Sequence, residues 1–197
     1  HSFPTRRSSD LALKMEGIEE LLFALSEYTK MPEYQEKFGA TVFKITRDAQ
    51  GSRLTHLKVT GGVLKARNLL SGHKQNKAED IWEEKINQIR IYSGEKYETK
   101  DEVEAGTICA VTGLSYTYPG EGLGSQEESE LPILEPVLTY ELILPDGVQP
   151  QAMMPKLAML EEEEPELHIV WNEELQEIKI QIMGEVQIEI LKALDRK

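Results

Sequence analysis

The chain has 197 residues, of which 40% are hydrophobic and 29% are charged. This composition is typical of a globular protein and excludes a disordered or fibrous chain. The longest unbroken apolar run, Leu21–Leu25, is far shorter than the roughly 20 residues that a membrane span needs, so no membrane partner is expected. The single cysteine, Cys109, cannot form an intramolecular disulfide, and we therefore expect a cytoplasmic protein.

Charge is distributed unevenly along the chain. The net charge is −13, but residues 126–166 hold eleven acidic residues and one lysine, which gives −10. Residues 41–100 hold twelve Lys or Arg against seven Asp or Glu, a net of +5. The acidic total would argue against nucleic acid, but a local basic segment can still meet an anionic polymer on one face.

The first periodic segment predicts an amphipathic helix. Apolar residues recur at spacings of three and four from Ile18 to Tyr28, with Gly17 as a plausible N-cap and Pro32 beyond the end. A single helix has nothing of its own to pack its apolar stripe against. We expect the partner of this stripe to lie elsewhere, because the residues before the helix cannot supply it.

The middle of the chain has the patterning of β strands. Strands are predicted over Ala40–Thr46, Leu54–Thr60, Val63–Leu70, Lys85–Tyr92 and Thr107–Leu114. Short strands separated by turns at this spacing favour a small all-β barrel. Tyr116–Pro132 is rich in Gly, Pro, Ser and Glu, and is interpreted as a linker or an extended loop.

The last third of the chain has the order β-α-β-β-α. The predicted elements are a strand over Val137–Leu144, a helix over Gln151–Glu163, a hairpin from Leu167–Trp171 and Glu177–Met183, and a helix over Glu185–Leu194. Ile178, Ile180 and Ile182 are expected to face inward. This order is one strand short of a ferredoxin-like domain. The fold class expected is therefore mixed β and α+β.

Three stretches of sequence carry a family resemblance: Gly39–Asn68, Lys85–Leu114 and Leu131–Leu191. Together they resemble the second domain and most of the third domain of a translational GTPase of the elongation factor G superfamily. Within it, the resemblance is strongest to the ribosomal-protection tetracycline-resistance proteins and their relatives. Arg67-Asn68 departs from the elongation factor pattern, which usually ends Gly-Asp there.

The resemblance implies a division of the chain into domains. Residues 12–34 would be the last helix of a missing GTP-binding domain, 35–118 a translation-factor β-barrel, 119–134 a linker, and 135–197 a truncated ferredoxin-like third domain. Residues 1–11 resemble one translated frame of a common sequencing adapter, and we interpret them as an artefact. The chain is thus expected to be a fragment from the middle of a longer protein.

The family implies GTP and magnesium for the intact parent, with the ribosome as its partner. A phosphate loop needs a Gly-Lys pair, and none occurs in the sequence. Asn76–Asp80 only approaches the guanine-reading motif, with the Asp one residue too far. Gly120, Gly122 and Gly124 are spaced like a nucleotide loop, but the acidic residues among and after them would repel phosphate. We expect no cofactor in this fragment and no GTP hydrolysis by it.

Basic residues form the clearest constellation for function. They are Lys44, Arg47, Arg53, Lys58, Lys65 and Arg67. We expect these side chains to meet at one rim of the barrel and to contact the phosphates of small-subunit ribosomal RNA, as the resemblance implies. The alternative is an ordinary solvated barrel surface.

No pattern predicts a catalytic or metal site. Four consecutive carboxylates, Glu161–Glu164, cannot all face one ion and are interpreted as a solvated helix cap. His56, His73 and His168 share no ligand spacing, and Cys109 is expected to be buried. The alternative function is a stand-alone RNA-binding β-barrel module without a GTPase parent. In either case we expect a monomer that does not bind DNA.

Overall fold

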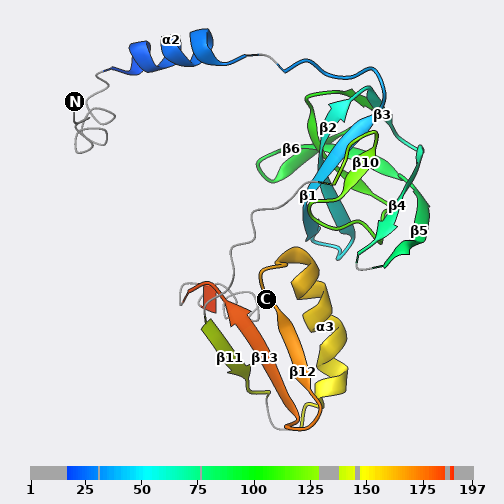
Figure 1. Cartoon of the computed structure of the whole chain (residues 1–197), viewed down its shortest axis with the longest axis vertical. Helices are drawn as coiled ribbons and strands as arrows, with labels where there is room; N and C mark the ends of the chain where they lie inside the picture. Colours follow the sequence, from blue (N-terminus) through cyan, green and yellow to red (C-terminus); the bar gives the residue numbers. More distant parts are fainter. Residues whose placement is uncertain are drawn as a thin grey trace. The chain divides into compact units, whose positions relative to one another are not determined.

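The computed structural model describes residues 17–30, 32–75, 77–128, 138–144, 147–184 and 187–188, with backbone alone for 77–79. The chain divides between Glu33 and Tyr34 into two units, which are described separately. The described residues are mostly β strands with the helices α2 and α3 (Figure 1). This confirms the predicted mixed β and α+β fold class.

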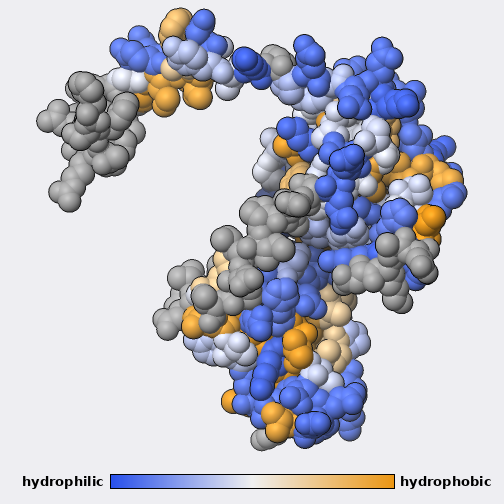
Figure 2. Space-filling view, viewed as in Figure 1, coloured by the Kyte–Doolittle hydropathy of each residue, from blue (hydrophilic) through white to orange (hydrophobic). Residues whose placement is uncertain are grey.

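Helix α2 (Ile18–Tyr28) forms where the sequence predicts it. Gly17 is the N-cap with φ of 75°, a left-handed conformation that glycine adopts without steric cost. No residue of α2 is buried. Figure 2 shows hydrophobic atoms gathered along the lower side of this helix, with a further hydrophobic group on its upper side. The origin of this helix in a GTP-binding domain stays a prediction.

The barrel begins in the second unit with a six-stranded sheet (Figure 1). Its strands, in spatial order, are β10 (Gly122–Gly124), β1 (Gly39–Arg47), β2 (Arg53–Gly61), β9 (Ile108–Thr112), β6 (Gln88–Ser93) and β7 (Lys96–Lys100). All the pairings are antiparallel. The inward side chains of β1, β2, β9 and β6 supply much of one buried core, which includes Ile45, Leu57, Val59, Val111 and Ile89.

Two smaller sheets complete the barrel. They pair β3 (Val63–Lys65) with β8 (Glu102–Glu104), and β4 (Leu69–Lys74) with β5 (Lys77–Lys85). The prediction of one continuous strand over Val63–Leu70 is wrong, because Arg67 has φ of 68° and breaks the extended backbone between β3 and β4. Strands β5, β7 and β8 were not predicted.

Part of the predicted linker belongs to the barrel. Gly122–Gly124 form β10 on the edge of β1, so the loop prediction is wrong for these residues. A side chain at Gly122 would collide with the backbone carbonyls of Gln126 and Glu127, and one at Gly124 with that of Phe38. The glycines therefore serve close backbone packing. The end of the predicted linker, residues 129–134, lies outside the described residues.

The last part of the second unit has a helix over a three-stranded sheet. Its elements are β11 (Leu138–Leu142), α3 (Pro150–Glu163), β12 (Ile169–Asn172) and β13 (Glu177–Ile182), with the sheet order β11-β13-β12. Ile178, Ile180 and Ile182 are buried as predicted. Leu160 of α3 packs on this sheet core with Leu167. With β13 between β11 and β12, the sheet has the strand order of the first three strands of a ferredoxin-like domain.

Two predictions for the chain ends are not covered. The predicted helix Glu185–Leu194 falls outside the described residues except for 187–188, and the suspected artefact of residues 1–11 falls outside entirely. Pro155 lies inside α3, which begins at Pro150. Its missing N–H costs one backbone hydrogen bond to Gln151.

Candidate nucleic-acid interface on the barrel

The turn between β1 and β2 places two of the candidate arginines opposite each other. Asp48 Oδ1 accepts hydrogen bonds from the backbone N–H groups of Gln50 and Ser52, at 3.0 and 2.9 Å. The pKa of Asp48 lies below its ordinary value, and the hydrogen bond from the Ser52 N–H is the largest cause of this shift. With the turn fixed in this way, Arg47 and Arg53 become paired residues at the end of the hairpin.

Both arginines contact the acidic end of α3. Arg47 Nη2 lies 2.8 Å from Glu162 Oε2, and Arg53 Nε lies 3.3 Å from the same oxygen. Arg47 Nε is also 3.6 Å from Glu163 Oε1. Carboxylates at the C-terminal end of a helix oppose its dipole, and the arginines offset that cost. The predicted solvated cap thus keeps Glu162 exposed, but the carboxylates of Glu162 and Glu163 are also paired with arginines, which the sequence does not predict.

Arg53 is held more firmly than Arg47. Its Nη1 donates to Thr55 Oγ1 at 3.2 Å, to the carbonyl of Leu114 at 2.9 Å and to Thr117 Oγ1 at 2.8 Å. Its Nη2 donates to the carbonyl of Thr117 at 2.6 Å. A guanidinium has five donors, and these bonds use most of them within the protein. RNA contact by Arg53 stays a prediction that would require some of these bonds to break.

We expect Arg53→Lys to lower the free energy of unfolding by about 1–3 kcal/mol. Lysine lacks the planar fork of five donors, so the carbonyls of Leu114 and Thr117 would lose partners that a buried group needs. Urea denaturation of the full chain measures this loss. Arg47→Lys is the matched control, because the partners of Arg47 are the partly exposed carboxylates of Glu162 and Glu163. Equal effects of the two variants would contradict a structural role specific to Arg53.

The other candidate cations lie elsewhere on the barrel. Lys44 and Lys58 are exposed on the outward face of the sheet, whereas Arg53 shares the inward alternation of Thr55 and Leu57. Lys65 lies on β3 and forms an ion pair with Glu102 at 3.3 Å. The exposed Arg67 follows it, with its N–H bonded to the carbonyl of Ile86. The expectation that all of these side chains meet at one rim is therefore wrong.

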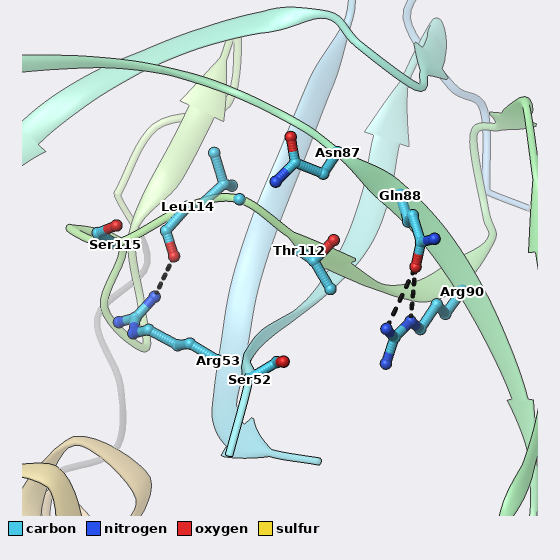
Figure 3. Close-up of a pocket in the computed structure, with 9 residues that line it drawn as sticks. Ser52, Arg53, Asn87, Gln88, Arg90, Thr112, Leu114 and Ser115 are labelled. Carbon is cyan, nitrogen blue, oxygen red and sulfur yellow. Dashed lines mark hydrogen bonds between the residues drawn. The ribbon is translucent and has the colours of Figure 1, made fainter. Parts of the chain in front are cut away.

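A polar pocket of about 500 Å³ lies between Arg53 and Arg90 (Figure 3). Figure 3 shows Arg53 directed at the carbonyl of Leu114 and Arg90 directed at Gln88. Arg90 Nη1 is also 3.0 Å from Asp48 Oδ2. Because the donors of both guanidinium groups are engaged in this way, the pocket does not present an open site for an anion.

A buried carboxyl, which the sequence does not predict, lies beside the barrel core. Glu121 is 3% exposed, and its Oε1 accepts a hydrogen bond from Trp82 Nε1 at 3.0 Å. Burial raises the pKa of Glu121 to about 7, although the bond from Trp82 opposes the shift. A side chain at Gly72 would collide with this carboxyl and with the Trp82 ring. Through its bond with Trp82, Glu121 thus links the segment Tyr116–Pro132, which was predicted to be a loop, to the β4–β5 hairpin.

The described residues offer no metal centre. No group of three His, Cys, Asp or Glu residues there could hold an ion. Cys109 is buried as predicted, and burial raises the pKa of its thiol to about 12. Since the thiolate is the reactive form, this side chain acts as a small hydrophobic residue of the core.

Two kinds of known protein are similar to the chain in sequence. No family model matches it. It is 31% identical over 168 residues to elongation factor G of Amoebophilus asiaticus, a match that covers 82% of this chain and 23% of the relative. The chain is a homologue of elongation factor G. The chain is also 28% identical over 182 residues to tetracycline resistance protein TetP of Clostridium perfringens. That match covers 90% of this chain and 27% of the relative.

The fold of this elongation factor G homologue is also found in a solved structure. A crystal structure of a protein from Thermus thermophilus matches 90% of this chain and 27% of its own, with a TM-score of 0.67 and 22% identity. The homologue spans about a quarter of the length of the curated relatives it matches. Among its described residues, no helix is long and apolar enough to cross a membrane.

Proposed function

We propose that the chain is part of a ribosome-associated translation factor with GTPase activity, and that its barrel contacts small-subunit ribosomal RNA. The observation that carries the proposal is the match to both elongation factor G and TetP over 82% to 90% of the chain. A match of that extent includes barrel strands as well as the helix and sheet that follow. Two kinds of relative thus share most of the second unit.

The surface of the barrel supports the RNA contact. Lys44 and Lys58 lie on its outward face with their side chains exposed, and Arg67 is exposed beyond β3. Phosphate contacts need exposed cations, which displace the counterions of the nucleic acid, and they do not depend on the identity of the bases. Arg47 and Arg53 already neutralise Glu162, so they are weaker candidates than Lys44 and Lys58.

GTP and magnesium enter the proposal only through the family resemblance of the sequence. The glycines of Gly120–Gly124 do not fit a phosphate, because Gly122 packs against the carbonyls of Gln126 and Glu127 and because the Glu121 carboxyl lies beside them. Carbonyl and carboxyl oxygens repel phosphate oxygens. No hydrolytic step is therefore assigned to these residues, and GTP hydrolysis is proposed for the longer protein alone.

The test is sedimentation of the full chain with small ribosomal subunits at increasing salt. We expect Lys58→Gln to lower the affinity and to flatten the plot of log K against log salt by about one phosphate equivalent. Arg47→Ala should flatten the slope less, since Arg47 is paired with Glu162.

Lys30→Gln is the matched control, because Lys30 is exposed in the first unit and the charge change is the same. An unchanged slope for Lys58→Gln would remove that residue from the interface. Failure of the unmodified chain to sediment with subunits at low salt would contradict the proposed function.

A further inference from the structure

The outward face of the six-stranded sheet carries a row of rings. The centroids of Phe43 and His56 are 6.2 Å apart, those of His56 and Tyr92 are also 6.2 Å apart, and those of Tyr92 and Tyr97 are 5.3 Å apart. The row crosses from β1 to β7. We call these four residues the aromatic strip.

Strand register explains why the rings share one face. An irregularity between Val42 and Lys44 gives β1 an extra residue, so Phe43 as well as Lys44 points away from the core. Tyr92 and Tyr97 are directly paired on β6 and β7. Phe43 is 43% exposed and Tyr97 is 47% exposed, so the two ends of the strip face solvent.

Cations flank the strip. Lys44 is paired with His56 on the neighbouring strand, and Lys58 follows His56 at the next outward position of β2. The guanidinium of Arg90 lies 4.5 Å from the centre of the Tyr97 ring, in a cation–π contact. Along β1, β2, β9, β6 and the paired part of β7, the outward positions hold no Asp or Glu.

The absence of carboxylates at these strand positions sets the face apart from the rest of the protein. The whole chain carries a net charge of −13, yet the outward positions hold Lys44, Lys58 and Arg90, of which Arg90 is paired with Asp48 of the β1–β2 turn. An ordinary solvated face of an acidic protein would mix both signs along its strands. Exposed rings beside two exposed lysines fit a partner that has flat apolar surfaces and negative charges at short intervals.

From this arrangement we infer that the aromatic strip is a stacking platform for unpaired RNA bases, with Lys44 and Lys58 beside the phosphates. The inference rests on the proposed function and specifies which part of an RNA the barrel takes. Base–aromatic stacking requires a free base face, and a continuous duplex offers none along its length. The platform therefore selects loops, bulges or single strands, largely without regard to base identity.

The test compares two RNA probes on the full chain. One is a labelled oligoadenylate of about ten nucleotides, within the site sizes of known single-strand platforms. The other is the same strand paired with its complement. We expect tighter binding of the single strand, and we expect the double substitution of Phe43→Ala and Tyr97→Ala to weaken that binding by about 10-fold or more. The salt slope should not change, because no cation is removed.

Two controls separate stacking from a general loss of structure. Tyr97→Phe keeps the ring and should bind the single strand as the unmodified chain does. Leu69→Ala removes an exposed apolar side chain of β4, outside the strip, and should also leave binding unchanged. Urea denaturation midpoints check that the barrel of each variant is intact.

Equal affinity for single strand and duplex, or unchanged binding after loss of both rings, would overturn the inference. Sedimentation with ribosomal subunits reports separately on the proposed function. If the chain sediments with subunits but the rings do not matter, the inference fails and the proposed function stands. If ring-dependent binding of the single strand occurs without sedimentation, the platform stands and the ribosomal assignment fails.

Discussion

Trp82→Ala is expected to lower the free energy of unfolding of the second unit by about 3–5 kcal/mol. Trp82 is 2% exposed and belongs to the same buried core cluster as Leu64 and Leu70. Its ring lies against Gly72 on the paired strand. Removal of the indole therefore leaves a cavity and also leaves the buried Glu121 without its donor.

Ile81→Ala provides the matched control for this experiment. Ile81 precedes Trp82 on β5 but is 69% exposed, so its truncation should change stability by no more than about 0.5 kcal/mol. Urea denaturation should be followed by far-ultraviolet circular dichroism, because Trp82 and Trp171 are the two tryptophans and the variant removes one fluorescent probe. A loss below about 1 kcal/mol would show that the β4–β5 hairpin does not fold cooperatively with the barrel.

The Glu121 carboxyl is expected to make the barrel less stable as the pH rises from 5 to 8. Burial raises the pKa of Glu121 from 4.5 to about 7 in the folded state. The folded protein thus keeps a proton that the unfolded chain releases above pH 4.5. The stability that this proton contributes is full below pH 4.5 and is lost as the pH rises through 7. Between pH 5 and pH 8 the loss is about 2–3 kcal/mol.

Comparison of the Glu121→Gln variant with the unmodified chain isolates the loss of stability that the Glu121 carboxyl causes as the pH rises. The amide oxygen still accepts the hydrogen bond of Trp82, but the side chain has no proton to lose. The titration of His56 makes the folded state more stable as the pH rises, which is the opposite of the effect of Glu121. The reason is that burial, and then the charge of Lys44, lower the pKa of His56. The stability difference between variant and unmodified chain should therefore be followed by urea denaturation at each pH from 5 to 8.

That difference should grow by about 2–3 kcal/mol in favour of the glutamine variant as the pH rises. Glu127→Gln, an exposed neighbour, is the control and should follow the unmodified chain. A difference that stays constant across this range would mean that Glu121 does not hold a proton in the folded barrel.

Much of the architecture followed from local patterns. The helix over Ile18–Tyr28 and the inward positions Ile178, Ile180 and Ile182 were predicted because their period alone decides which side is apolar. Strand β7 was not predicted because Lys96–Lys100 is exposed at every position and carries no alternation of burial. The places of β5 and β7 in their sheets depend on pairing with β4 and β6.

The candidate site was predictable only as a set of residue types. The cations were visible in the sequence, but their directions depend on strand alternation and on one bulge. That bulge turns Phe43 outward beside His56. Likewise, the partner of Arg47 lies 115 residues further along the chain, at Glu162. A local pattern carries no information about an ion pair of that separation.

The helix over Ile18–Tyr28, the main barrel strands, the uneven charge and the resemblance to elongation factor G could be read from the sequence alone, because each of these depends on neighbouring residues or on matched stretches. In contrast, the burial of Glu121 against Trp82, the contacts of two arginines with α3 and the shared surface of four rings appear only in the folded chain. These features arise where strands distant in sequence meet, and burial and charge there depend on the fold as a whole.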